Sequence, residues 1–224
     1  MRIFLLVLCV YLWMPLAMAQ QPKTTVEGSE MGNAIFDDQA LLDGYAAKYA
    51  EESKDVLLAM AGDDSIGAYK IAAAIRVFRE KFAADVLSHE KPLIIKTLMR
   101  RLNRTDSAFV QVEIMHTLVV VDRYQYFESM TGALILKMDH YNRVVSANAY
   151  NALDAITRDS TRNREARIVF NMLRKVLFLS RKRLENIDEP DERLRQKLDL
   201  LRWSIKVLGT QELKRLPSEV IRLL

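Results

Sequence analysis

The fold is decided by two stretches that share one pattern, VQVEIMHTLVVV at residues 110–121 and VSANAYNALDAI at residues 145–156. In each stretch, an apolar residue is followed by apolar or small residues four, seven, eight and eleven positions later. This spacing places all five side chains on one face of an α-helix. The two copies begin 35 residues apart, so the sequence predicts a helical unit that is repeated along the chain.

Each copy is followed by a second amphipathic segment. The first of these begins near Tyr126, and the second runs from Arg164 to about Leu184. The β-branched run at residues 119–121 continues a helical pattern, so it does not indicate a strand. We therefore predict an all-α fold, a short α-solenoid of antiparallel helix pairs. A non-repetitive helical bundle is the alternative.

The second copy resembles the first helix of a HEAT repeat through the residues Val145, Ala149, Ala152, Leu153 and Ile156. The segment PLIIKTLMRRLNRTD at residues 92–106 looks like a HEAT second helix. The resemblance implies a right-handed superhelix in which small residues let neighbouring repeats approach closely. The first copy departs from it, since Ile114 and Thr117 stand where that family has alanines, and the step is shorter than the family's roughly 40–47 residues. Tetratricopeptide repeats have a period of about 34, but their signature does not align with this chain.

Residues 1–19 have the features of a signal peptide. Arg2 precedes an apolar run at residues 3–13 that is too short to cross a membrane as a mature helix, and residues 17–19 form an A-x-A cleavage site. We expect export to the periplasm or the extracellular space, and a soluble mature chain that begins at Gln20; a retained membrane anchor is the alternative. Cleavage removes Cys9, the only cysteine, so disulfides and zinc–thiolate sites are not expected.

Charge and composition divide the rest of the chain. Residues 20–33 are polar, with Pro22 and two glycines, and are expected to form a flexible leader. From residue 20 to 66 there are ten acidic residues against three lysines, whereas residues 67–224 hold 29 basic and 19 acidic residues. We therefore predict an acidic N-terminal helical segment at residues 34–66 and a basic HEAT-like repeat domain at residues 67–224. This asymmetry permits attraction to an acidic partner or membrane surface, or contact between the acidic segment and the basic domain. Ordinary solvated helix faces are the simpler interpretation.

Helix boundaries follow from capping residues and prolines. Asp37 or Asp38 is expected to cap the first helix, and a long helix is expected over residues 69–87. Helices are expected to start at Pro92, Pro190 and Pro217, because proline is tolerated in a first helical turn. In the helix at Pro92, apolar residues are expected to point inward and the basic residues, among them Arg101, outward.

No motif of a known catalytic class occurs, since the chain lacks nucleophile elbows, zinc-binding H-E-x-x-H helices and glycine-rich phosphate loops. Only Glu113 and His116 have a chemical interpretation, because Glu-x-x-His places a carboxylate and an imidazole one turn apart, as in di-iron bundles. Those bundles need two such motifs, and one is present here. An exposed glutamate beside a surface histidine is the simpler interpretation. We therefore expect no enzyme, no cofactor and no small-molecule substrate.

Basic residues gather on the segment that follows the second copy. The candidate interaction stripe consists of Arg164, Arg167, Asn171, Arg174, Lys175, Arg181 and Lys182. Such a stripe suits a carboxylate-rich protein, and an anionic membrane surface is the alternative partner. Export disfavours nucleic acid. The opposing interpretation is a solvated face that the acidic loop at residues 188–192 partly neutralises. The predicted function is that of an exported protein-interaction or scaffold module.

Overall fold

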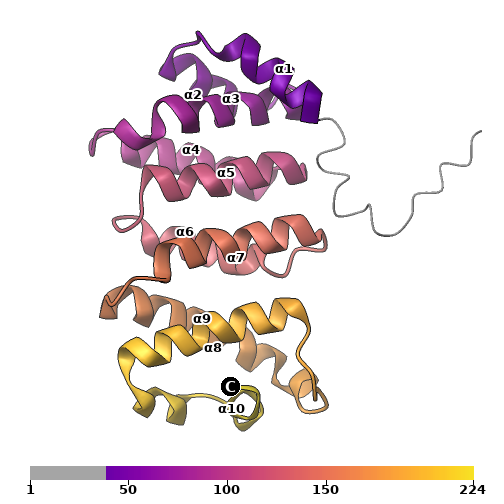
Figure 1. Cartoon of the computed structure of the whole chain (residues 1–224), viewed down its shortest axis with the longest axis vertical. Coiled ribbons are helices and arrows are strands. Elements are labelled where there is room, and N and C mark those ends of the chain that lie inside the picture. Colours follow the sequence, from indigo (N-terminus) through magenta and orange to yellow (C-terminus); the bar gives the residue numbers. More distant parts are fainter. Residues whose placement is uncertain (1–38) are drawn as a thin grey trace, which may run out of the picture. The chain divides into compact units, whose positions relative to one another are not determined.

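Helix follows helix through residues 39–224, the part of the chain that this computed structural model describes (Figure 1). The elements are α1 (Gln39–Tyr49), α2 (Lys54–Gly62), α3 (Ala68–Lys81), η4 (Ala83–Asp85), α4 (Lys91–Arg104), α5 (Ala108–Val121), α6 (Phe127–Lys137), α7 (Arg143–Thr157), α8 (Asn163–Leu184), α9 (Glu192–Leu208), η5 (Thr210–Arg215) and α10 (Ser218–Leu223), where η4 and η5 are 3₁₀ turns. Residues 39–224 contain no strand, which confirms the predicted all-α class. The predicted signal peptide, the predicted leader and the predicted caps at Asp37 and Asp38 lie outside the described residues.

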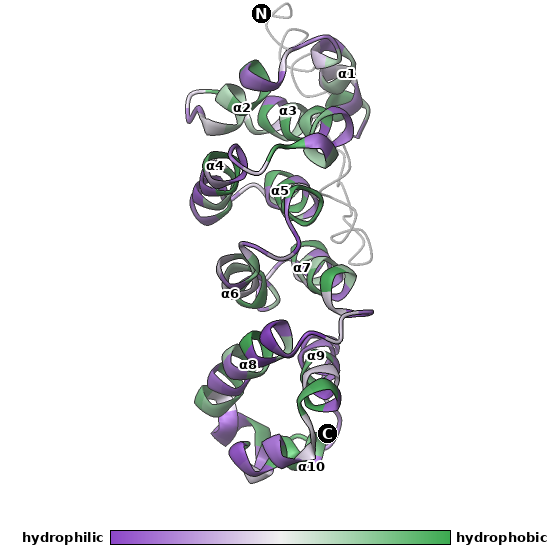
Figure 2. Cartoon of the chain, turned by 90° about the vertical axis from the view of Figure 1, so that its left-hand side faces the viewer, coloured by the Kyte–Doolittle hydropathy of each residue, from purple (hydrophilic) through white to green (hydrophobic). Residues whose placement is uncertain are grey.

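The helices lie in two columns. One, which we call the odd column, holds α1, α3, α5, α7 and α9, each in contact with the next. The other, the even column, holds α2, α4, α6, α8 and α10 in the same way. Figure 2 shows most of these helices end-on, with α4, α6 and α8 beside α5, α7 and α9. Successive helices also contact one another across the columns, as α4 does with α5 and α6 with α7.

Helix α5 lies at the centre of the packing. It contacts α3 and α7 within its column, and also α4 and η4. The predicted face of α5 is buried, and so are residues on its other sides, such as Val112, Met115 and Val119. A helix that is apolar on all sides is typical of a core position. Small residues allow the close packing of the odd column, because Ala72, Ala73 and Ala74 on α3 have no exposed surface.

The helix ends follow local signals in the sequence. Pro92 lies in the first turn of α4, and α9 begins two residues after Pro190, where the Asp191 side chain accepts a hydrogen bond from the backbone N–H of Leu194. Asn142 caps α7 in the same way through Val144. Helix α9 ends at Leu208 and is followed by Gly209, whose φ of 104° favours glycine. The starts expected at Pro92, Pro190 and Pro217 therefore lie within two residues of the observed ones.

Two predictions about this region were wrong. The helix expected over residues 69–87 ends at Lys81, because the chain turns at Phe82 and passes through η4, which packs against α5 and buries Ala83. Arg101 was expected to point outward but is only 8% exposed. Its guanidinium donates hydrogen bonds to the carbonyl oxygens of Ala61 and Asp63 at the end of α2, at 2.9 and 2.5 Å, and pairs with the Asp64 carboxylate.

No helix within residues 39–224 combines the length and the apolar character that a membrane span requires.

Candidate interaction surface on helix α8

Helix α8 is amphipathic along its 22 residues. Its buried face consists mainly of apolar side chains, among them Ala166, Val169, Phe170, Leu173 and Leu177. These residues recur at three- and four-residue steps, so they lie on one side of the helix and the basic residues lie on the others. The core thus fixes which side chains of α8 face the solvent.

The structure places the seven residues of the candidate stripe in two rows. Residues Arg164, Asn171, Lys175 and Lys182 form the outward row, which lies opposite the buried face and is exposed. Within residues 39–224, none of these four side chains takes part in an ion pair or a hydrogen bond. The charges of the outward row are therefore available to a partner.

The remaining three residues form an edge row, in which Arg167, Arg174 and Arg181 are half-buried. Arg167 pairs with the Glu212 carboxylate of η5 at 2.5 Å. The hydrogen bond from Arg167, assisted by one from Arg215, lowers the pKa of Glu212, so this carboxylate stays ionised and held. The Arg181 guanidinium donates a hydrogen bond of 3.2 Å to the backbone carbonyl oxygen of Phe178 and lies 4.3 Å from the centre of the Phe178 ring. Only Arg174 in this row has no polar partner among the described residues.

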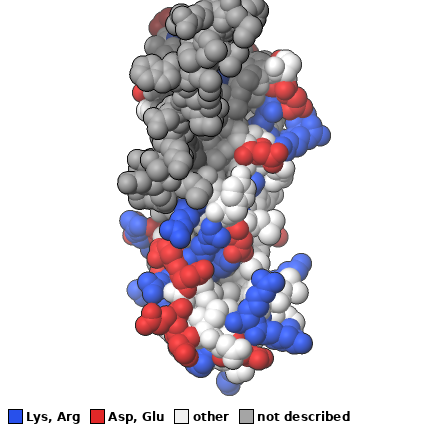
Figure 3. All heavy atoms as spheres, turned by 90° about the vertical axis from the view of Figure 1, so that its right-hand side faces the viewer, with Lys and Arg blue, Asp and Glu red and all other residues white. Residues whose placement is uncertain are grey.

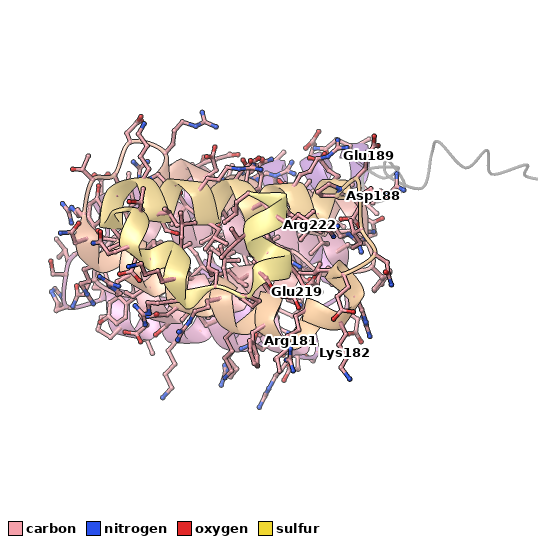
Figure 4. The ribbon with its side chains drawn as sticks, turned by 90° about the horizontal axis from the view of Figure 1, so that it is seen from below. Arg181, Lys182, Asp188, Glu189, Glu219 and Arg222 are labelled. Atoms are coloured by element: carbon pink, nitrogen blue, oxygen red, sulfur yellow. The ribbon has the colours of Figure 1, made fainter. Side chains whose placement is uncertain are left out.

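The acidic loop that follows α8 does not pair with either row among the described residues. Figure 4 shows Arg181 and Lys182 on one side of the molecule, and Asp188 and Glu189 on another. In the space-filling view, basic side chains gather at the lower right with few acidic neighbours, whereas both charges alternate at the lower left (Figure 3). The outward row of α8 is therefore not neutralised by the acidic loop or by any other carboxylate within residues 39–224.

Large apolar side chains lie beside these cations. Phe178 is 50% exposed and Leu179 75% exposed, and on the neighbouring helix α6 Leu136 is 71% exposed. Sequence reasoning missed all three residues. The signal was present, because the consecutive Leu177, Phe178 and Leu179 cannot all face one core from one helix. The surface on α8 is thus both basic and apolar.

The side chains of Glu113 and His116 have different partners. Glu113 is 4% exposed, so the expectation of an exposed glutamate was wrong. Its carboxylate pairs with Arg76 at 2.6 Å and with Arg79 at 2.5 Å, and both arginines come from α3. His116 instead makes a hydrogen bond of 2.7 Å with the Asn148 side chain of α7. The two residues face different neighbouring helices, and their polar atoms connect the odd column.

One concavity of the described chain carries charges of both signs. A cavity of about 430 Å³ lies between the N-terminal ends of α7 and α9. The cations Arg143 and Arg193 line it together with the anions Asp191 and Glu192, so its charges balance. This balance favours no ligand class, unlike the surface on α8.

Comparison with protein-family models, curated proteins and solved structures found no match.

Proposed function

We propose that this protein is an exported, non-enzymatic interaction module that binds an acidic protein partner through the outward row of α8. The observation that carries the proposal is that the exposed cations of this row, Arg164, Lys175 and Lys182, have no partner within residues 39–224. Cations that lie deeper in the molecule do have partners: Arg76 pairs with Glu113, and Lys197 with Asp139. Unpaired charges of one sign attract and orient a partner of the opposite sign.

We further propose that the helices form a short HEAT-like α-solenoid of antiparallel pairs. The proposal is supported by the alternating contacts of the two columns and by the buried alanines of α3 and α7. Such a stack contacts partners through extended helix faces rather than through a deep pocket. The proposal of export rests on the signal-peptide features of residues 1–19.

Charge reversal tests the binding role. We expect Lys175→Glu combined with Lys182→Glu to abolish capture of the partner by cross-linking in the exporting cell. The matched control is Arg195→Glu combined with Lys206→Glu, which reverses two exposed cations of α9, and it should capture the partner normally. Circular dichroism should show the same helical content in all variants. Equal capture by both double variants would refute a role for α8.

A second candidate function is attachment to an anionic membrane surface. The observation that favours it is the exposure of Phe178 and Leu179 on the same helix as the cations of α8, a composition that also suits lipid headgroups. Cosedimentation with phosphatidylglycerol vesicles at low and high ionic strength tests it. Binding that does not weaken with added salt would contradict the electrostatic form of this function.

A further inference from the structure

The exposed leucines of α6 and α8 lie on neighbouring helices of the even column. Helix α6 contacts α8, and a methyl group placed on Gly132 of α6 would lie 3.6 Å from the methyl carbon of the Met172 side chain of α8. Leu136 follows Gly132 by one turn, and Leu179 follows Met172 by two turns. In the proposed stack α6 and α8 run in the same direction, so both leucines belong to the C-terminal part of this surface.

An apolar row runs along α8 on the side of α6. Ile168, Met172 and Leu179 follow one another at steps of four and seven residues, so they share one side of the helix. Ile168 and Met172 are half-buried, and Leu179 is mostly exposed. The outward row of cations lies next to this apolar row and runs parallel to it.

We infer that this two-row surface binds an acidic amphipathic helix of a partner protein. The inference deepens the proposed function and rests on it. The apolar face of such a helix would cover Met172, Leu179 and Leu136, and its acidic flank would meet Lys175 and Lys182. Amphipathic helices dock in this way, through apolar anchors spaced by three and four residues.

The layout of the rows favours a helix over a lipid bilayer. A bilayer contact requires apolar side chains that project beyond the cations into the acyl region. Here the apolar row lies to one side of the cations, and it includes the half-buried Ile168 and Met172. A helix whose apolar and acidic faces lie side by side can contact the apolar row and the outward row at the same time.

Neither row is sufficient for tight binding. Ion pairs between exposed side chains contribute little individually and weaken with salt. The leucines contribute through the apolar area that a partner covers, which does not depend on salt in the same way. The affinity for the partner should therefore fall as the ionic strength rises. The affinity that remains at high salt should depend on the leucines.

The test uses the purified protein and a synthetic amphipathic helix of about 20 residues, long enough to form in water, with leucines on one face and glutamates on its flanks. We expect saturable binding in fluorescence anisotropy. Leu136→Ser combined with Leu179→Ser should weaken it at least about tenfold. Leu93→Ser is the matched control, because Leu93 is 69% exposed on α4, outside this surface, and it should change the affinity little. A peptide of the same composition with a scrambled order should bind weakly.

Each other outcome overturns the inference. If the charge reversals at Lys175 and Lys182 abolish binding while the leucine variant binds normally, the proposed function stands and the amphipathic helix is wrong. If neither variant changes peptide binding, both proposals fail. Binding to phosphatidylglycerol vesicles but not to the peptide would assign the surface to lipid. A dimer in analytical ultracentrifugation that the leucine variant dissociates would assign it to a second copy of this chain.

Discussion

Single residues on α5 show how packing changes the meaning of a sequence motif. Glu113 and His116 stand one turn apart, as a metal motif requires, but α5 is enclosed by α3 and α7, and each residue faces a different neighbour. No local feature of the sequence indicates that Arg76 and Arg79, which precede Glu113 by more than thirty residues, pair with its carboxylate. The burial of Glu113 was therefore not predictable from periodicity, which assigns a charged residue to the solvent.

The buried carboxylate should be important for stability. Glu113→Ala removes the buried carboxylate that pairs with two arginine side chains, which are only 15% and 19% exposed, so we expect it to lower the free energy of unfolding by about 3 kcal/mol. Glu80→Ala is the control, because the Glu80 side chain is 58% exposed beside Arg79 and should cost at most about 1 kcal/mol. Urea denaturation measures both. Equal effects would show that Glu113 is not a buried ion-pair partner.

At the scale of the elements, α8 combines predictable and unpredictable features. Its start and its buried face follow from periodicity, and the sequence located its basic residues correctly on one helix. Its C-terminal end depends on the tertiary structure, because the Arg222 guanidinium of α10 donates hydrogen bonds to the carbonyl oxygens of Leu184, Glu185 and Ile187, at 2.9–3.0 Å (Figure 4). Arg101 does the same at the end of α2. Arginines from distant elements thus satisfy helix-terminal carbonyls.

Removal of this cap should loosen the end of α8. Arg222→Ala leaves three carbonyl groups without their donor, and we expect it to lower the free energy of unfolding by about 1–3 kcal/mol. Amide hydrogen exchange should become faster at residues 184–188. Arg183→Ala provides a comparison, since Arg183 is exposed and has no hydrogen bond or ion pair among residues 39–224, and exchange should stay nearly unchanged. Unaltered exchange in Arg222→Ala would mean that α10 does not hold α8.

At the scale of the whole described unit, stability should vary along the columns. Helix α5 has packed neighbours on several sides, whereas α1 and α10 each lie at an end of a column. In a stack held by contacts between neighbours, the terminal units open more easily than the central ones. The arrangement of the columns therefore predicts that local stability is highest at α5 and lowest at α1 and α10, which the sequence of a single helix does not indicate.

Native-state hydrogen exchange measured by mass spectrometry tests this order. We expect the slowest exchange in α5 and the fastest in α1 and α10, with α3 and α7 between them. The reason is that opening a terminal helix exposes one packed face, whereas opening α5 disrupts contacts with α3, α4 and α7 together. Exchange at one common rate in every helix would indicate a single cooperative unit instead.

The sequence by itself determined the all-α class, the helices from α4 to α9 and the apolar residues that they bury, because helical periodicity, prolines and caps are local properties of the chain. Only the tertiary structure decided which charged side chains form ion pairs and hydrogen bonds with other elements. Arg101, Glu113 and Arg167 are held by residues from other elements, whereas Lys175 and Lys182 have no ion-pair partner within residues 39–224. Charge pairing and surface exposure depend on neighbours that are distant in sequence, and periodicity carries no information about them.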